Sequence, residues 1–305
     1  MFIAIFIGIK NGYLSFAVTE NKEIEQNNKQ KSKYQFLSKY VSDNQISQTK
    51  TNEFQNKINT IKQQNQEIDF SVYFRDFNNG PWLSYNSLVF FDGASLLKLP
   101  ILVTYLKAAE KNESLLQQKV FYESAYSSDR NPDEKFDQTL NVGETYTIGY
   151  LLEVMTTKSD NVAKNMLQDL INELDIRPNL EETKEILGVY DETTNSISSE
   201  KYAGIFRILY NAEYLTPQMS EKALEILSRA EYKDGLVNKL PDNIKVSHKF
   251  GVRYSSQNSN YQLHDCGIIY ATNPYSLCVM TIGNNPEKQK QIISEISKIS
   301  FELFN

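Results

Sequence analysis

Strand-like segments lie at both ends of residues 67–305, and a long stretch of helical pattern separates them. The first two strand-like runs, in IDFSVYFRDFNNGPWLSYN, flank Asn79-Gly80, a dipeptide typical of β-hairpins. Three more, NIKVSHKFGV, HDCGIIYAT and YSLCVMTIG, precede an amphipathic helix that begins at Pro286. The pattern between residues 147 and 230 is helical. Strands from both ends with helices between them predict an α+β fold, in which an antiparallel sheet carries an inserted helical lobe.

Two segments of different character precede this predicted domain of residues 67–305. Residues 1–18 are apolar apart from an interruption at Lys10 and Asn11, and the run from residue 2 suits a signal peptide core or, read to residue 18, a marginal membrane span. No basic region precedes the run, and the alternative interpretations are a peripheral strand and an incomplete gene start. Residues 19–66 are rich in Asn, Gln, Lys and Glu, which predicts a polar linker or stalk.

Composition argues against several classes of partner. The net charge is −6, from 32 basic and 38 acidic residues, and no dense basic cluster is present. We therefore expect no nucleic-acid partner. The two histidines, His248 and His264, and the two cysteines show no metal-ligand spacing, so neither a metal nor another cofactor is expected. The acidic charge and the single domain favour a monomer.

The two cysteines, Cys266 and Cys278, flank a predicted hairpin. If its turn centres on Asn273-Pro274, Cys278 faces Ile269, and Cys266 lies three residues out of register on the opposite face. A disulfide is disfavoured on that geometry, and two buried thiols are expected.

The stretch FFDGASLLKLPILVTYLK places Ser95 and Lys98 at the start of a helix that leads into the core. Residues three apart share one face of a helix, so the lysine is positioned to activate the serine. Two further motifs follow in order, Ser159-Asp160-Asn161 and Lys249-Phe250-Gly251. Each is weak alone: both serines suit N-caps, Lys98 suits a solvated first turn, and the third motif suits a strand followed by a bulge. Their order, spacing and structural context together favour a catalytic site.

These three motifs resemble the SxxK, SDN and KTG signatures of the class A β-lactamase and penicillin-binding serine acyltransferase superfamily, over residues 67–305. The resemblance implies a five-stranded antiparallel sheet flanked by terminal helices. It implies that Ser95 is the nucleophile, and that Lys98 is the base if a second cation and burial lower its pKa. Ser159 would relay a proton, and Lys249 would supply positive charge.

The resemblance also implies a substrate-binding set. Asn161 would hold the substrate's side-chain amide, and the backbone N–H groups of Ser95 and Val252 would meet the oxyanion next to Gly251. Phe250 departs from the pattern, because the residue at this place is usually Thr or Ser, whose hydroxyl helps to bind a substrate carboxylate. Two alternatives are open: Phe250 faces the core instead, or the carboxylate relies on Lys249 and nearby Ser255 or Ser256.

A second departure concerns deacylation. Class A β-lactamases carry Glu-x-x-Leu-Asn between the second and third motifs, and this sequence has none between residues 162 and 248. Glu192 and Glu200 are the nearest carboxylates, and Glu192 in YDETTN suits a turn. Since a positioned general base contributes about 10²–10⁴-fold, its loss would slow deacylation.

Three functions therefore remain open. The first is a serine β-lactamase-like hydrolase, the second a D,D-peptidase acting on peptidoglycan peptides, and the third a catalytically weak domain that binds cell-wall material. All three predict an extracytoplasmic location, secreted or membrane-anchored through residues 2–18, in a bacterial cell envelope.

Overall fold

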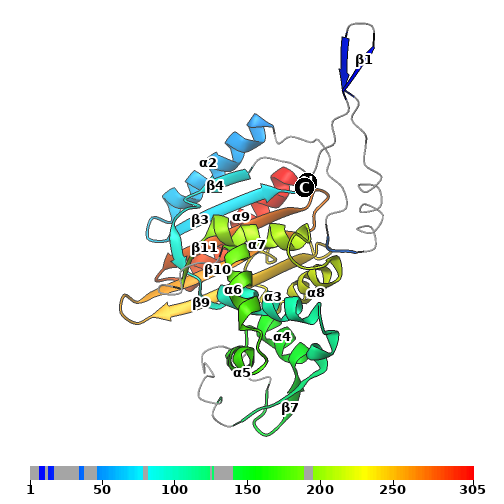
Figure 1. The fold of residues 1–305 in the computed structure, drawn as a ribbon. Helices are drawn as coiled ribbons and strands as arrows, with labels where there is room; N and C mark the ends of the chain where they lie inside the picture. Colours follow the sequence, from blue (N-terminus) through cyan, green and yellow to red (C-terminus); the bar gives the residue numbers. More distant parts are fainter. Residues whose placement is uncertain are drawn as a thin grey trace.

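The computed structural model of the 305-residue chain describes residues 7–10, 13–16, 34–37, 47–77, 82–123, 126, 140–188 and 195–305. Its centre is a five-stranded antiparallel sheet in the order β4-β3-β11-β10-β9 (Figure 1). The strands are β3 (Asp69–Asp76), β4 (Trp82–Tyr85), β9 (Val246–Ser255), β10 (Asn260–Ile269) and β11 (Tyr275–Gly283). The predicted α+β class and the sheet built from both ends of the domain are confirmed. The turn predicted at Asn79-Gly80 lies outside the described residues.

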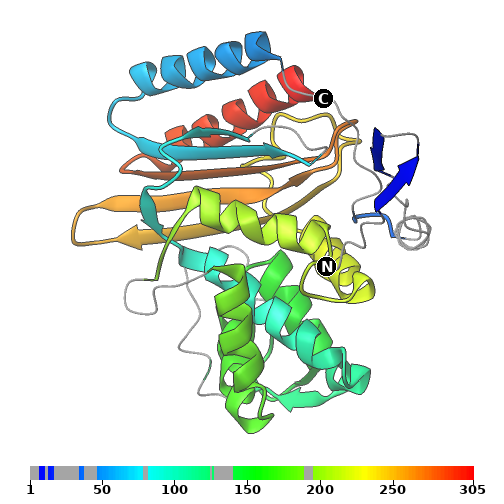
Figure 2. The ribbon, with the colours of Figure 1, turned by 45° about the horizontal axis from the view of Figure 1, so that its top comes forward.

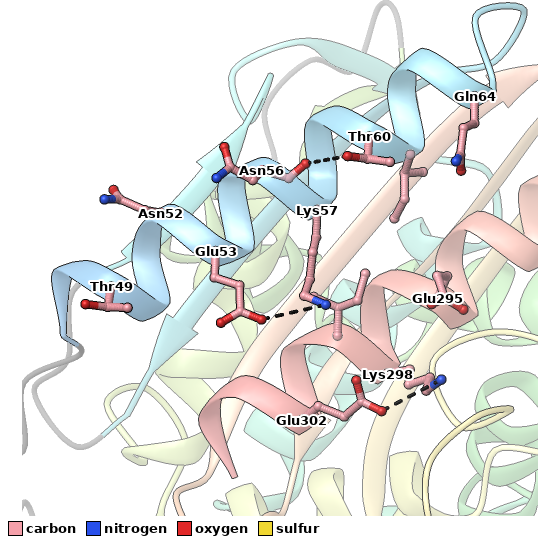
Figure 3. A pocket seen from close by; sticks show the side chains of 12 residues that line it. Thr49, Asn52, Glu53, Asn56, Lys57, Thr60, Gln64, Glu295, Lys298 and Glu302 are labelled. Carbon is pink, nitrogen blue, oxygen red and sulfur yellow. Dashed lines mark hydrogen bonds and ion pairs between the residues drawn. The ribbon is translucent and has the colours of Figure 1, made fainter.

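One face of the sheet is covered by two helices, α2 (Gln48–Gln64) and α9 (Pro286–Phe304), which lie side by side (Figure 2). Apolar residues of both helices pack with the sheet in one buried cluster. Between them runs a surface groove lined by polar side chains of α2 and α9 (Figure 3). None of the sequence motifs contributes to this groove.

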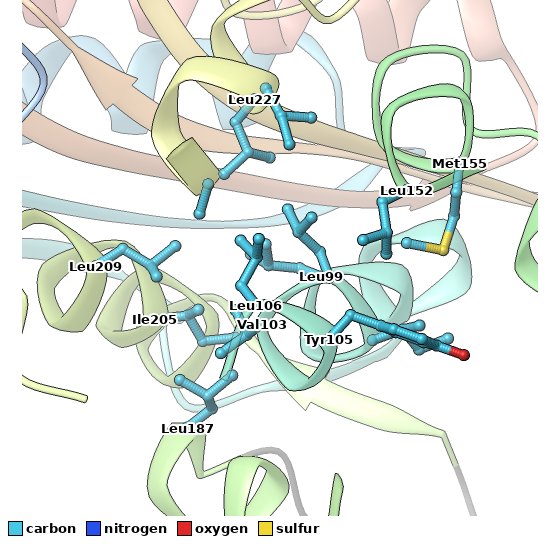
Figure 4. Close-up of a cluster of buried hydrophobic side chains, with 14 of the residues drawn as sticks. Leu99, Val103, Tyr105, Leu106, Leu152, Met155, Leu187, Ile205, Leu209 and Leu227 are labelled. Carbon is cyan, nitrogen blue, oxygen red and sulfur yellow. The ribbon is translucent and has the colours of Figure 1, made fainter. Parts of the chain in front are cut away.

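The helical lobe packs against the other face. Its helices are α3 (Lys98–Ala109), α4 (Ile148–Thr157), α5 (Asn161–Glu173), α6 (Arg177–Leu187), α7 (Ser199–Tyr210) and α8 (Pro217–Ser228), with short 3-10 turns η1 (Ala94–Leu97) and η2 (Glu113–Gln117). Helix α3 is buried along nearly its whole length, and its Leu99, Val103 and Leu106 meet side chains of the other lobe helices (Figure 4). Ser95, the candidate nucleophile, therefore lies directly before a helix that is buried among the other helices of the lobe.

Short strand pairs complete the described fold. They are β1 (Ile7–Lys10) with β2 (Tyr13–Phe16), β5 (Phe90–Asp92) with β8 (Ser196–Ser198), and β6 (Lys119–Phe121) with β7 (Thr145–Thr147). The first pair falls within the predicted signal or anchor segment, whose role stays a prediction. Among the described residues, no helix has the length and apolar character needed to cross a membrane.

The structure corrects the boundary of the predicted linker. Residues 48–64 form α2, whose N-cap Ser47 accepts a hydrogen bond from the Lys50 amide. Phe54, Ile58 and Ile61 of this helix are buried against the domain. Three apolar residues at helical spacing are enough to dock an otherwise polar helix. Phe36 and Leu37, earlier in the predicted linker, are also buried in the core, so the boundary predicted at residue 67 is wrong.

The structure also corrects the prediction for the cysteines. Cys266 of β10 lies directly opposite Cys278 of β11, and the two form a disulfide. The last paired residues before the loop are Ile269 and Tyr275, so the turn is not centred on Asn273-Pro274. Loop length sets the register of a hairpin. The different turn position is the reason that Cys278 lies opposite Cys266 and not opposite Ile269, as predicted from the sequence.

Candidate active site

Ser95 lies in the turn η1 that joins strand β5 to helix α3. Ala94, just before it, has a φ of 45°, in the left-handed region that costs energy for a residue other than glycine. Hydrogen bonds hold this backbone: the Asp92 carboxylate accepts from the Ala94 amide at 2.9 Å, and the Gly93 amide donates to the Asn195 carbonyl at 2.8 Å. Ser95 itself is partly exposed.

The turn is also held from the lobe and from the sheet. The hydroxyl of Tyr202, in α7, donates to the Leu96 carbonyl at 3.0 Å, and burial raises the pKa of this phenol well above its usual value, so it remains a donor. Strand β9 passes so close that a Cβ on Gly251 would lie 3.1 Å from the Gly93 carbonyl oxygen and 3.2 Å from the Leu96 nitrogen. Glycine at this position therefore lets the third motif approach the turn that carries Ser95.

The second motif precedes helix α5. Ser159 is buried and has a φ of 60°. The N-cap of α5 is Asp160, whose carboxylate accepts from the Ala163 amide at 2.7 Å. Neither Ser159 nor Ser95 caps a helix, since the N-caps of η1 and α3 are Gly93 and Leu97. The interpretation of the two serines as simple caps is therefore wrong.

Lys98 is buried and points at the second motif. Its Nζ donates to the Ser159 carbonyl, to the Ser159 Oγ at 3.2 Å and to the Asn161 Oδ1 at 2.7 Å. The interpretation of Lys98 as a solvated lysine is wrong. The Lys98 side chain therefore joins the first motif to the second.

Lys249, on the edge strand β9, completes the cluster. Its side chain is fully buried, and its Nζ donates to the Ser159 Oγ at 3.0 Å and to the Phe250 carbonyl at 2.9 Å. The Ser159 hydroxyl therefore lies between two lysine amines that come from segments 151 positions apart in the sequence, at residues 98 and 249. A hydroxyl that contacts two amines is placed to pass a proton between them.

The Phe250 side chain is buried against Tyr232. Their rings stack with centroids 4.4 Å apart, and the Lys249 Nζ lies 4.3 Å from the Phe250 ring centroid. A cation over an aromatic face is stabilised by the ring quadrupole. The hydroxyl that is usual at this place is thus replaced by an apolar wall that contacts the cation. Tyr232 carries no sequence signal, and sequence analysis missed it.

We expect Phe250→Thr to destabilise the protein by about 3 kcal/mol, because it removes a buried ring and the stacking contact of that ring with Tyr232. Affinity for carboxylate-bearing ligands should not rise, since the replaced side chain lies in a packed position. Urea unfolding measures the first effect and ligand titration the second. Phe250→Leu, which keeps an apolar side chain of similar size, should lose less stability. An unchanged unfolding midpoint in the threonine variant would contradict the packing described.

The remaining predicted residues are less central. Val252 is half-buried on β9 just after Gly251, Ser255 is the last residue of that strand, and Ser256 follows it. Glu200 accepts a hydrogen bond from the Ser87 hydroxyl at 2.9 Å, and Glu192 lies outside the described residues. Within the described ranges, no group of three or more His, Cys, Asp or Glu side chains is arranged to bind a metal.

Residues 53–304 match the beta-lactamase enzyme family. The chain belongs to this family. Its motif residues, Ser95, Lys98, Ser159 and Lys249, all lie inside the matched range. A search of curated protein sequences found no match.

Solved structures agree on the fold. A class A beta-lactamase from Bacteroides cellulosilyticus superposes with a TM-score of 0.73 at 18% identity, over 85% of this chain and 99% of that one. PBP-A superposes with a TM-score of 0.69 at 21% identity, over 86% of this chain and 97% of that one. A PBP-A variant in an acyl-enzyme complex with penicillin G is also similar, with the same TM-score. At these identities the likeness establishes the class A beta-lactamase-like fold.

Proposed function

We propose that the protein is a serine β-lactamase-like hydrolase that opens β-lactam amides through an acyl-enzyme on Ser95. The observation that carries the proposal is the Ser159 hydroxyl held between the amines of Lys98 and Lys249, beside the turn that presents Ser95. Burying a charged amine costs several kcal/mol per ion. Two buried lysines on one hydroxyl are therefore not expected at a helix start that has only a structural role.

In this mechanism the Ser95 Oγ attacks the β-lactam carbonyl carbon while Lys98, in its neutral form, takes the hydroxyl proton. The oxyanion is met by the backbone N–H groups of Ser95 and Val252. The C–N bond then breaks, and a proton reaches the leaving nitrogen through Ser159. Lys249 stabilises negative charge on the substrate, and Asn161 binds the side-chain amide. Water finally hydrolyses the ester and releases Ser95.

A second function, a D,D-peptidase-like enzyme that acts on peptidoglycan peptides, is favoured by one specific feature. The sequence lacks Glu-x-x-Leu-Asn between residues 162 and 248, and α6 and β8 are joined by residues 188–195 alone. The same four residues would carry acylation, and deacylation would be slow. PBP-A, a neighbour by fold, has a variant solved with penicillin G as an acyl-enzyme.

Intact-protein mass after incubation with benzylpenicillin, sampled from seconds to hours, tests the proposal. An increase of one penicillin that decays within minutes supports the hydrolase. An increase that persists for hours moves the assignment to the peptidase-like enzyme. No increase at any concentration contradicts acylation and leaves a binding domain for cell-wall material.

We also propose an extracytoplasmic location, with residues 2–18 as export signal or anchor. The Cys266–Cys278 disulfide supports it, because disulfides persist in oxidising compartments and are rare in the cytosol. Labelling of whole cells with a reagent that does not cross membranes, followed by digestion and mass analysis, tests the location. Labelling only after lysis would contradict it.

A further inference from the structure

His264 is a buried histidine that none of the three motifs includes. It lies on β10 directly opposite Gly251 of β9, and its side chain has no solvent exposure. Its Nε2 is 2.8 Å from the Asp92 carbonyl oxygen of β5, and its Nδ1 is 3.1 Å from the Thr281 amide of β11. A single imidazole thus joins three strands, two from the central sheet and one from the strand that leads into the nucleophile turn.

The partners determine the state of the ring. A carbonyl only accepts, so the Nε2 carries the hydrogen toward Asp92, and an amide only donates, so the Nδ1 accepts from Thr281. The imidazole is therefore neutral and in one tautomer. Burial also favours the neutral form, because it lowers the pKa of His264 to about 4. Asp92 is the charged residue that faces the ring, and its carboxylate is paired with Arg253 at 2.9 Å.

The bonded carbonyl belongs to the last residue of β5, three positions before the nucleophile. After Asp92 the chain enters the strained turn at Ala94 and then presents Ser95. The Asp92 carboxylate accepts a hydrogen bond from the Ala94 amide within this turn. The bond between His264 and the Asp92 carbonyl connects the first residue of the turn to the central sheet. Edge-to-face contact with Phe91, at 5.7 Å between centroids, fixes the ring plane.

We propose that His264 is a positioning residue that sets the place of the Ser95 turn relative to strand β9 through its hydrogen bond to the Asp92 carbonyl. This role rests on the proposed acylation of Ser95, and it concerns geometry and not proton transfer to substrate. A misplacement of about 1 Å in a reacting group lowers a rate by about 10²-fold, so one anchoring bond at this point has a large effect.

Two substitutions separate this role from a general contribution to stability. His264→Gln places an amide N–H where the Nε2 lies and keeps a donor for the Asp92 carbonyl. His264→Asn places its amide oxygen where the Nδ1 lies, which keeps the acceptor for Thr281 and removes the donor for Asp92. Val279→Ala, in the apolar cluster on the opposite face of the sheet, serves as a destabilised control with both histidine bonds intact.

Two readouts are measured at a temperature where all variants are folded. Hydrogen exchange of the amides in residues 93–97 reports the turn without any substrate, and the rate of penicilloyl adduct formation reports its consequence. We expect faster exchange and an acylation rate about 10–100-fold lower in the asparagine variant. The glutamine variant and Val279→Ala should stay within about threefold of the native protein, whatever their melting temperatures.

Equal exchange and equal acylation rates in the asparagine and glutamine variants would overturn the positioning role. So would a rate that follows melting temperature across all three variants. If the native protein forms no adduct, the proposed function fails, and the exchange comparison still decides whether His264 holds the turn.

Discussion

Ser95→Ala should abolish the covalent penicillin adduct completely while leaving the fold intact. The substitution removes only the hydroxyl oxygen, and the hydrogen bonds that hold the backbone of the turn, from the Asp92 carboxylate, the Asn195 carbonyl and the Tyr202 hydroxyl, remain. Because Ser95 is partly exposed, the free energy of unfolding should change by less than about 0.5 kcal/mol. Intact-protein mass and a thermal melt measure the two effects.

Ser84→Ala is the matched control, since this exposed serine lies on β4, at the opposite edge of the sheet from β9. It should form the adduct at the native rate. An adduct that persists in the Ser95 variant would show that another group is acylated. Loss of the fold in that variant would contradict the description of the turn.

Lys98→Ala should slow acylation by about 10²–10⁴-fold, the scale of a positioned general base. Removal of the lysine also takes a donor from the Ser159 carbonyl and the Asn161 Oδ1, which are part of a buried cluster. A loss of stability of about 1–3 kcal/mol should accompany the substitution. The adduct formation rate, measured below the melting temperature, separates the two effects.

Lys98→Arg tests the chemical role more narrowly, because a guanidinium keeps the positive charge and does not act as a base. We expect it to acylate as slowly as the alanine variant. A near-native rate in either variant would exclude Lys98 as the base, and a native rate in the arginine variant alone would assign it an electrostatic role.

The cluster of Lys98, Ser159 and Lys249 could be predicted from the sequence because its residues lie in short motifs with recognisable surroundings. Ser95 and Lys98 are one helical turn apart, so their proximity is a local property. Lys249 is brought to Ser159 by the closing of the sheet, which the order of strands and helices indicates only together with the family resemblance. The structure places both amines on one hydroxyl.

Other features depend on contacts that no local pattern contains. Residues 48–64 look like a polar linker because only Phe54, Ile58 and Ile61 face the domain. The cysteine pairing depends on the exact length of one loop. His264 and Tyr232 contact partners on distant elements, Asp92 and Phe250, and their own neighbours in the sequence do not distinguish them from ordinary core residues.

The position of the penicillin adduct decides whether Ser95 is the nucleophile. Protein incubated briefly with benzylpenicillin is quenched in acid, digested and sequenced by tandem mass spectrometry. We expect one penicilloyl group, on Ser95, in a peptide that also contains Lys98. A penicilloyl group on Ser159, or on any residue other than Ser95, would contradict this expectation.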